Sequence, residues 1–533
     1  MTWVSALIAV PIVAAVVTLF VKGDNSKYFA FIASLIPLAL SLYVWAALFE
    51  STGNVLLDPG GIQLEERINW INIAGYQIQY FVGLDGVSMP LVLLTTLLTT
   101  LAIMSAWPAI EERQHQFYAL MLFLEGALIG VFVTLDFLAF YVFWEGVLIP
   151  MYFLIAVWGT DEGDDRMYPS ILGKIAKGSH RDSRYAAIKF FVYTNIASLI
   201  MFIGVVALFF NTGVQNLSLV ELTQAIQGGQ LGGAFGMSAE QFKLLAFLAL
   251  FVGFAVKVPI VPLHTWLPDA HVKAPTPVSV ILAGVLLKMG TYALLRFNFT
   301  MLSDVALNNA YLIGVVGVVS VIYGALLAMA QNDLKRIVAY SSISSMGYVI
   351  IGLAAYTQYA VGGATFQMLS HGLLSGLLFM VVGVIYNKAH TRDVHEISGL
   401  IHRMPIVATV FVAGAFGYMG LPGMSGFAAE IFVFLGSMGS DFLPNSTILV
   451  PVAMFGIVIV AGYLLFAMQR TLFGDYRAPE EYRDSLTDAT LVEAIPLVVL
   501  ILVIIVLGVW PDLAYGMIQD STVSVVRLAT GGV

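Results

Sequence analysis

The stretch AVKVPIVPLHTWLPDAH, residues 255–271, interrupts a long apolar segment with one lysine, two histidines, one aspartate and three prolines. Pro259 and Pro262 have no N–H to donate to the carbonyl groups four residues before them. The carbonyl groups of Ala255 and Val258 are therefore expected to lose their hydrogen bonds within the helix. The stretch predicts a helix broken beside Lys257.

The whole chain has the composition of an integral membrane protein. Of its 533 residues, 59% are hydrophobic and 11% are charged, whereas soluble domains have roughly 45–50% apolar and about 25% charged residues. The formal charge of -9 argues against a nucleic-acid partner. Because the chain has no cysteine, it can hold no cysteine-ligated iron–sulfur cluster. The first apolar stretch lacks the features of a cleaved secretory signal and predicts a retained transmembrane helix.

The apolar runs predict an all-α, polytopic fold with about 14 transmembrane helices. A bilayer core about 30 Å thick requires about 20 apolar residues per helix. The expected spans are 2–21, 28–49, 86–107, 116–134, 137–158, 186–210, 243–267, 277–298, 310–330, 335–354, 363–386, 404–435, 447–470 and 490–511. Spans seven and twelve are irregular, because prolines and glycines interrupt them.

Basic residues gather in alternate loops between these spans. One set of loops holds most of the lysines and arginines, among them Lys22, Arg113, Lys273, Lys388 and Arg470. Since basic loops stay on the cytoplasmic side, both termini are predicted to lie outside. The expected location is a bacterial or archaeal plasma membrane. The loop 159–185, which mixes acidic and basic residues, is interpreted as a solvated connector.

A second helix break, GAFGYMGLPGMSGFAAEIFVFLG at residues 414–436, indicates an internal repeat. If helices 4–8 and 9–13 form two five-helix units, the broken helix is the fourth in each unit, and the two units are inverted. The expected units are 1–115 with helices 1–3 and an outside loop, 116–298 with the first repeat, 310–470 with the second repeat, and 471–533 with a loop and helix 14.

Four ionisable side chains are expected deep in the membrane: Glu145, Lys257, Lys288 and Glu430. Each costs at least about 2.5–3.5 kcal/mol to insert, so each requires a reason. The alternatives are snorkelling for the lysines, a protonated carboxyl bonded by a neighbouring helix for Glu145, and a purely structural role beside the break for Glu430. A buried lysine near a carboxylate can change its protonation state when that carboxylate moves. We therefore interpret Lys257 as a proton carrier and Glu145 as the carboxylate that modulates it.

Further titratable groups are weaker candidates. His371 and His264 could relay protons, because an imidazole titrates near cellular pH; the alternative is a neutral, hydrogen-bonded histidine. Glu125 is another carboxylate in the middle of a helix. A metal site at His264, His271 and Asp269 is disfavoured because no further ligand cluster accompanies them. The chain also shows no P-loop and no dinucleotide fingerprint, so neither a metal nor a cofactor is expected in it.

Several motifs resemble one family. They are KVPIVPLHTWLPDAHVKAPTPVSVILAGVLLKMGTYALLR at 257–296, FWEGVLIP at 143–150, RIVAYSSISSMGYVIIG at 336–352, MLSHGL at 368–373 and LPGMSGFAAE at 421–430. With these motifs the chain resembles, over about residues 80–510, the proton-pumping antiporter-like subunits of respiratory complex I. The block at 257–296 is the most specific of the five.

The resemblance implies inverted five-helix repeats and a chain of polar residues along the membrane midplane. It implies that protons move through the matching residues of that chain, which are Glu145, Lys257, Lys288, His371 and Glu430. It also implies that FMN, iron–sulfur clusters and quinone bind to other subunits. The implied partners are membrane-arm and peripheral-arm subunits, including neighbouring antiporter-like subunits, together with lipids.

Two positions distinguish this chain within the resemblance. Glu430 favours the chain M type, because the chain L and chain N types and sodium/proton antiporter subunits usually carry lysine there. Ser345 stands where many relatives have histidine; a serine can hold a water molecule but cannot titrate. The alternatives are a multisubunit sodium/proton antiporter, a hydrogenase-type or F(420)H(2)-dehydrogenase-type complex, and a scaffold that transports nothing.

Overall fold

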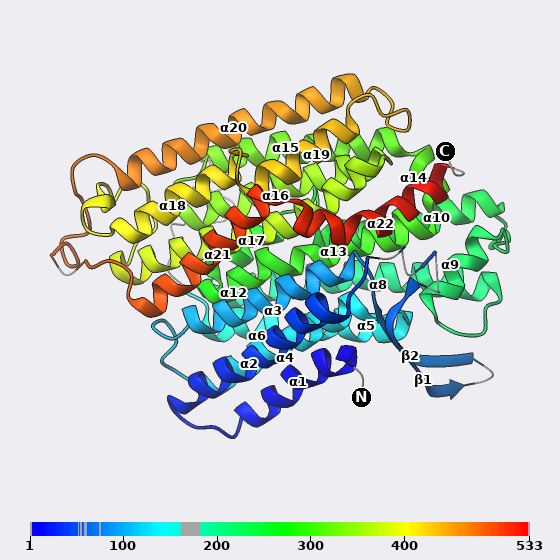
Figure 1. Ribbon diagram of the computed structural model, residues 1–533, viewed down its shortest axis with the longest axis horizontal. Coiled ribbons are helices and arrows are strands. Elements are labelled where there is room, and N and C mark those ends of the chain that lie inside the picture. The colour runs from blue at the N-terminus through cyan, green and yellow to red at the C-terminus, as the bar shows by residue number, and fades with distance from the viewer. Residues whose placement is uncertain are drawn as a thin grey trace.

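The computed structural model describes residues 3–51, 53, 56–57, 61–73, 76–160, 182–484 and 486–530. Figure 1 shows helices lying side by side along the long axis of the molecule. In these ranges, 12 helices are long and apolar enough to cross a membrane, and three shorter apolar helices account for the predicted first and twelfth spans. The expected polytopic helical fold is confirmed. Most of the predicted connector 159–185 lies outside the described residues.

The helices of the N-terminal half are α1 (Trp3–Thr18), α2 (Asn25–Tyr43), η1 (Val44–Leu48), α3 (Ser88–Ser105), α4 (Gln114–Val133), α5 (Phe137–Gly146), α6 (Leu148–Trp158), α8 (Ser183–Thr212), α9 (Leu219–Gln227), α10 (Ala239–Lys257) and α11 (Trp266–Lys273). The eighth predicted span consists of α12 (Thr276–Ile281), η4 (Leu282–Leu286), α13 (Leu287–Ala293) and η5 (Leu294–Met301). Within it, η4 and η5 are π-helical turns.

The remaining helices are α14 (Ser303–Asn308), α15 (Ala310–Met329), α16 (Leu334–Ala354), α17 (Gln358–Ala389), η6 (Leu400–His402), α18 (Pro405–Tyr418), α19 (Ser425–Ser437), α20 (Ser446–Leu472), α21 (Leu491–Val509) and α22 (Asp512–Thr530). The chain opens at both predicted breaks, between α10 and α11 and between α18 and α19. The boundaries of the two five-helix units stay a prediction.

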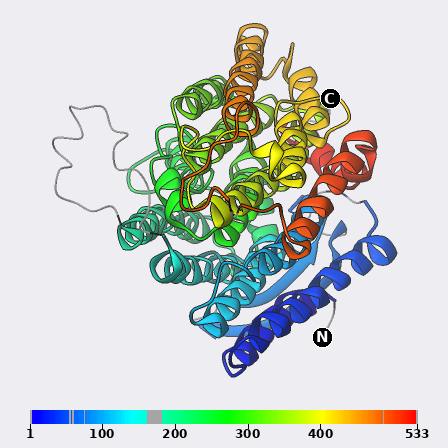
Figure 2. The ribbon, with the colours of Figure 1, turned by 90° about the vertical axis from the view of Figure 1, so that its left-hand side faces the viewer.

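Two segments form the centre of the bundle: the α12–η5 segment and α17. Seen end-on, they run through the middle of the molecule (Figure 2), and both are buried along nearly their whole length. Helices that are apolar on every side belong in such central positions. A charged side chain on either segment therefore faces protein instead of lipid.

Residues 63–84 contain the one hairpin of the described residues, which was not predicted. There, β1 (Gln63–Ile73) and β2 (Tyr76–Leu84) form an antiparallel hairpin. The hairpin is anchored at the turn between α4 and α5, where the N–H of Gln79 donates to Asp136 Oδ2 at 3.1 Å. Burial raises the pKa of Asp136 to about 6, although backbone N–H donors favour its ionised form. The search for long apolar runs missed these strands because their residues alternate between polar and apolar.

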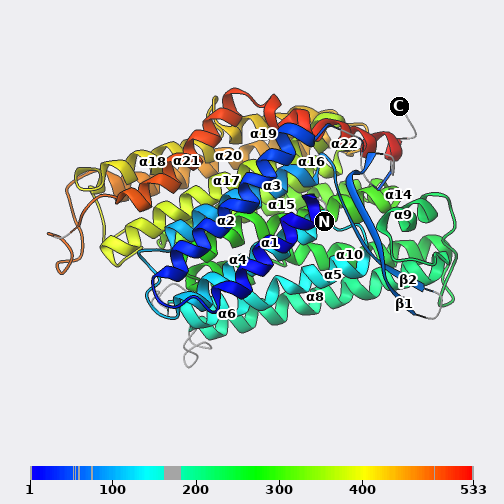
Figure 3. The ribbon, with the colours of Figure 1, turned by 60° about the horizontal axis from the view of Figure 1, so that its bottom comes forward.

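The C-terminal helix α22 was also not predicted. The chain turns at Trp510 and Pro511, and α22 then leaves α21 at an angle (Figures 1 and 3). It packs against α17, α3, α14 and η5. The hydroxyl of Ser521 accepts a hydrogen bond from the N–H of Gly86 at 3.0 Å, which fixes α22 to the turn before α3.

Candidate functional site: a buried chain of titratable side chains

At the first break, α10 ends at Lys257 and α11 begins at Trp266. The expectation of a released carbonyl at Ala255 is wrong, because the N–H of Ile260 donates to that carbonyl at 3.3 Å. This hydrogen bond spans five residues instead of the usual four, and it replaces the bond that Pro259 cannot make. The indole Nε1 of Trp266 donates to the carbonyl of Val256 at 2.9 Å and holds the two halves together.

The ammonium group of Lys257 lies among aromatic rings. The side chain is 1% exposed. Its Nζ lies 5.5 Å from the ring centroid of Trp144 and 5.6 Å from that of Phe190. Among the described residues, Nζ has no hydrogen-bond partner. Ring faces attract a cation but cannot take its proton, so this amine is held in place without a fixed ion pair.

Glu145 lies near this amine but does not touch it. Asn195 Nδ2 donates to its Oε2 at 3.1 Å, and the hydroxyl of Ser198 donates to its Oε1. Both partners belong to α8, which therefore orients the carboxylate. In the described part of the chain, Glu145 and Lys257 form no direct ion pair, but the carboxylate interacts electrostatically with the amine. A movement of Glu145 would change the field at Lys257.

The helix that carries Glu145 is itself interrupted. The structure divides the predicted span 137–158 into α5 and α6, which are separated by Val147. Pro150 cannot donate to the carbonyl of Gly146, so the helix loses a hydrogen bond one residue after Glu145. The glycine and the proline of FWEGVLIP are the features of the sequence that indicate this interruption.

Lys288 and His371 meet in the centre of the bundle. Lys288 Nζ lies 2.6 Å from His371 Nδ1 and donates to the carbonyl of Ala283 at 2.6 Å. The side chains are 0% and 1% exposed. Ala283 belongs to the π-helical turn η4, and such turns release backbone groups that can bind side chains. Sequence analysis proposed both residues but could not show their contact, because 83 residues separate them.

Glycines allow the helix of Lys288 to approach both neighbours. A Cβ on Gly372 would lie 2.7 Å from the carbonyl oxygen of Gly284, so the segment of Lys288 and α17 are in backbone contact there. A Cβ on Gly290 would lie 2.8 Å from the N–H nitrogen of Val258 and 3.0 Å from Cβ of Lys257. Lys288 is therefore positioned between the first break and His371.

Glu430 lies beside the second break. The side chain is 7% exposed, and a Cβ on Gly420 would lie 2.8 Å from its Oε2. Gly420 belongs to the turn between α18 and α19, so the carboxylate faces the break. Glu430 makes no direct hydrogen bond to Lys288 or His371 in the described part of the chain, and the gap is filled by other side chains.

The weaker candidates lie in separate surroundings. Glu125 is fully buried on α4, and neither carboxylate oxygen has a hydrogen-bond partner among the described residues. The ring of His264 packs edge-on against Tyr323, 5.7 Å between centroids. Asp269 pairs with Lys189 at 2.6 Å, and His271 stacks on Phe379. The three residues of the disfavoured metal site thus have different neighbours.

The burial of two further charged or titratable groups was not predicted from the sequence. His271 is fully buried, and its electrostatic neighbours are Lys288 and Lys335. Lys335 is another such group, because it is 1% exposed and donates to the carbonyl of Ala274 at 2.8 Å. The burial of His271 could have been predicted, because this residue directly follows the first break and lies in the motif at residues 257–296.

A buried ion pair lies at the far end of the Lys288 segment. Arg296 Nη2 lies 2.5 Å from Asp85 Oδ1, and the two side chains are 2% and 0% exposed. The burial of Arg296 was not predicted from the sequence. The guanidinium also lies over the ring of Tyr292, 5.0 Å from the centroid.

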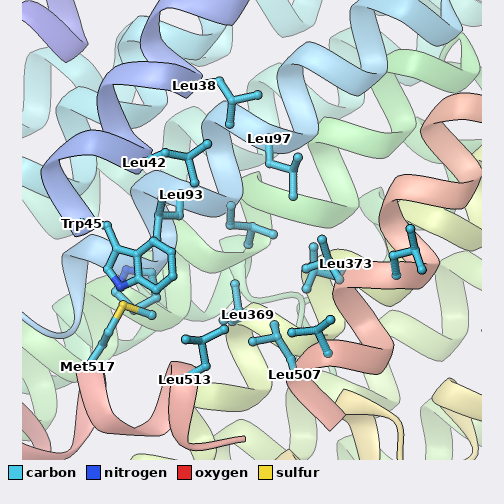
Figure 4. A pocket seen from close by; sticks show the side chains of 15 residues that line it. Leu38, Leu42, Trp45, Leu93, Leu97, Leu369, Leu373, Leu507, Leu513 and Met517 are labelled. Carbon is cyan, nitrogen blue, oxygen red and sulfur yellow. The ribbon is translucent and has the colours of Figure 1, made fainter. Parts of the chain in front are cut away.

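An apolar cavity of ≈ 400 Å³ lies away from these charges, between α2, α3, α17, α21 and α22 (Figure 4). Among its lining residues are Leu38, Leu42, Trp45, Leu93, Leu97, Leu369, Leu373, Leu507, Leu513 and Met517. Its leucines offer no proton donor or acceptor, so the cavity is separate from the polar chain.

Comparisons with known proteins identify the family to which this fold belongs. The family model "NADH:quinone oxidoreductase/Mrp antiporter, TM" matches residues 134–460, and "NADH-ubiquinone oxidoreductase chain 4, amino terminus" matches residues 63–131. The chain is 37% identical to F(420)H(2) dehydrogenase subunit M of Methanosarcina mazei, covering 99% of this chain and 98% of that one. It is 38% identical to NAD(P)H-quinone oxidoreductase chain 4 1 of a Synechococcus species, covering 98% and 92%.

A solved structure has the same fold. A chain of respiratory complex I from Thermus thermophilus with bound NADH aligns with a TM-score of 0.82 at 24% identity and covers 99% of both chains. The fold and the buried titratable chain thus define a polytopic membrane protein of the antiporter-like class. The chain belongs to the NADH:quinone oxidoreductase/Mrp antiporter transmembrane family.

Proposed function

We propose that this chain is the proton-translocating membrane-arm subunit of a complex I-type redox-driven pump. Protons move through Glu145, Lys257, Lys288, His371 and Glu430, while electrons pass to quinone in other subunits. The relatives of this chain are named as subunits of quinone oxidoreductases and of F(420)H(2) dehydrogenase, which supports an assembly of this kind.

The observation that carries the proposal is the contact between Lys288 Nζ and His371 Nδ1 at 2.6 Å. At this distance the pair carries at most one positive charge, because an ammonium can donate only to a neutral imidazole nitrogen and an imidazolium only to a neutral amine. A doubly protonated pair would place two like charges together at low dielectric. The pair can therefore accept a proton from one side and release it to the other.

Lys257 passes protons to this pair from the side of the first break. Its Nζ faces two rings and has no hydrogen-bond partner in the described ranges, so its charge responds to Glu145 through space. When Glu145 moves closer, the protonated amine is favoured; when Glu145 moves away or is neutralised, the proton is released. Coupling to electron transfer then needs only a displacement that reaches this carboxylate.

The remaining parts of the proposal concern the assembly. FMN, iron–sulfur clusters and quinone bind to other subunits, and this chain carries no redox centre of its own. Its partners are the membrane-arm and peripheral-arm subunits, including neighbouring antiporter-like subunits, and lipids. The complex lies in a bacterial or archaeal plasma membrane with both termini of this chain outside.

The test is the ratio of protons moved to electrons transferred by the intact complex in proteoliposomes. Lys257→Ala and Glu145→Ala are expected to abolish or strongly reduce this ratio while the complex still assembles. Lys243→Ala is the matched control, because Lys243 pairs with the half-exposed Asp304 at the surface. An unchanged ratio in both test variants rejects the proposal, and loss of assembly in both supports a scaffold instead.

The description of the family model also names the Mrp antiporter, so a sodium/proton antiporter is the rival function. An antiporter exchanges protons for sodium without electron flow. Proton uptake that persists without an electron donor and requires sodium would identify that function. Proton movement that stops when the donor is withheld supports the redox-driven pump.

A further inference from the structure

The ion pair of Lys189 with Asp269 joins α8 to α11, and neither residue belongs to the proposed proton path. Lys189 Nζ lies 2.6 Å from Asp269 Oδ2, and the two side chains are 23% and 12% exposed. The same amine donates to the carbonyl of Thr265 at 2.9 Å. Because Thr265 and Asp269 lie about one helical turn apart, one ammonium group binds the start of α11 at two points.

The helix α11 needs such contacts to stay in place. Residues 258–265 form no regular helix, so α10 and α11 are not one rigid element. Pro259 and Pro262 lie in this segment and cannot donate backbone hydrogen bonds that would continue α10. The position of α11 therefore depends on bonds to neighbouring helices, and α8 is one of the helices on which it packs.

The start of α11 also reaches the surroundings of Lys257. Trp266 Nε1 donates to the carbonyl of Val256, the residue before Lys257, at 2.9 Å. Phe190 follows Lys189 on α8, and its ring packs against that of Trp266 at 5.3 Å between centroids. The same ring of Phe190 lies 5.6 Å from Lys257 Nζ. A separation of α11 from α8 would therefore disturb both the backbone beside the amine and a ring that faces it.

Further along, α8 orients the carboxylate of Glu145. Asn195 Nδ2 and the hydroxyl of Ser198 donate to its two oxygens. Ser198 lies nine residues after Lys189, which is about 14 Å along a helix. Because α8 is an uninterrupted helix of 30 residues, Glu145 and the start of α11 are positioned from one rigid element.

We propose that Lys189 is a positioning residue for proton transfer at Lys257. By binding Asp269 and Thr265, it fixes α11 to α8 and thereby keeps Lys257 at a set distance from Glu145. The field of Glu145 at the amine depends on this distance. Lys189 itself does not carry the translocated proton. This inference rests on the proposed function.

The first test removes the joint between α8 and α11 and then replaces it with a covalent link. Lys189→Cys with Asp269→Cys deletes the ion pair. Proton translocation by the intact complex in proteoliposomes is expected to fall by about three- to tenfold, the scale of one net hydrogen bond. Because the natural chain has no cysteine, a short bismaleimide links only these two positions within it. Linking is expected to restore most of the lost translocation.

Two outcomes of this test contradict the positioning role. Translocation at the parental level in the unlinked double variant overturns it. A linked variant that assembles normally but stays as slow as the unlinked one also overturns it, because a covalent bond can replace a joint but not a pair of charges. The parent complex treated with the same reagent is the control for reaction with other subunits.

Two single variants separate the bond from the side-chain stem. Lys189→Arg keeps donors for Asp269 and Thr265 and should retain translocation. Lys189→Met keeps an apolar stem without a donor and should lose about as much as the unlinked double variant. Lys243→Met is the matched control, because Lys243 also lies 2.6 Å from a carboxylate, that of Asp304, but near the start of α10. Equal translocation in Lys189→Arg and Lys189→Met overturns the inference.

A density map of the Lys189→Met complex gives a readout that does not depend on activity. The indole nitrogen of Trp266 is expected to lie beyond hydrogen-bond distance from the carbonyl of Val256. An unchanged position of α11 overturns the inference. If Lys257→Ala instead pumps normally, the proposed function fails, whatever the map of the Lys189→Met complex shows.

Discussion

Lys257 and Arg296 are both buried cations, yet they differ in what surrounds them. Lys257 is 1% exposed and faces the rings of Trp144 and Phe190, and its Nζ has no hydrogen-bond partner in the part of the chain that the structure describes. Arg296 is 2% exposed and lies 2.5 Å from Asp85. The amine can lose its proton, whereas the guanidinium cannot. Burial is thus shared, and the direct partner separates a movable proton from a fixed charge.

The difference has a physical basis in desolvation. A buried charge without a partner is unstable and readily neutralises, while a buried charge with a bonded counter-charge stays ionised. Arg296 therefore connects the turn before α3 to the far end of the Lys288 segment permanently. Lys257 is suited to switching because nothing nearby fixes its charge.

The largest expected effect comes from breaking the fixed pair. Arg296→Met leaves Asp85 buried without its counter-charge and is expected to lower the free energy of unfolding by about 3–5 kcal/mol. Unfolding in mixed micelles measures this loss. The double variant Arg296→Met with Asp85→Asn removes both charges and should recover much of it. A single variant as stable as the parent would show that the pair is not a structural link.

The next effect comes from making Lys257 resemble Arg296. Lys257→Arg keeps the positive charge but supplies a group that does not deprotonate. Proton translocation is expected to fall by about a hundredfold, the scale of losing one positioned proton-transfer group. Proton uptake by proteoliposomes measures it, with Lys243→Arg as the control. Retained pumping would mean that Lys257 acts by charge alone.

A smaller effect is expected at the carboxylate that acts on Lys257. Ser198→Ala removes one of the two donors to Glu145 and is expected to reduce pumping by about threefold, the value of one net hydrogen bond. Ser198→Thr restores the hydroxyl and should restore the rate. If Ser198→Thr is as slow as Ser198→Ala, Ser198 contributes to packing and does not position Glu145.

The smallest effect is expected when Arg296 is made to resemble Lys257. Arg296→Lys keeps a cation beside Asp85, so stability should fall by only about 1 kcal/mol, the value of a lost hydrogen bond. The proton-to-electron ratio should not change. A large loss of pumping here would place Arg296 in the proton path and remove the distinction between the two cations.

The spans and the breaks could be predicted because local chemistry determines them. Twenty apolar residues fit a bilayer, and Pro259 and Pro262 interrupt a helix wherever it packs. The hairpin and α22 escaped the same search. β1 and β2 alternate polar and apolar residues, and α22 contains Asp512, Asp520 and Arg527, which interrupt an apolar run.

The side chains of the site could be proposed from the sequence, but their contacts could not. An intramembrane lysine or glutamate stands out in any apolar run. The contact of Lys288 with His371 instead depends on which helices pack together, and it is made possible by the close approach of Gly284 and Gly372.

The helix α22 has a consequence for the electrostatics of the whole chain. It packs on η5, and Ser521 bonds to Gly86, the residue that follows Asp85. By keeping bulk solvent away, α22 maintains the low dielectric in which the neighbouring carboxylate and guanidinium attract each other strongly. A detachment of this helix would hydrate both charges and loosen the outer end of the central segment. The strength of the ion pair between Arg296 and Asp85 therefore depends on α22, which is far from both residues in the sequence.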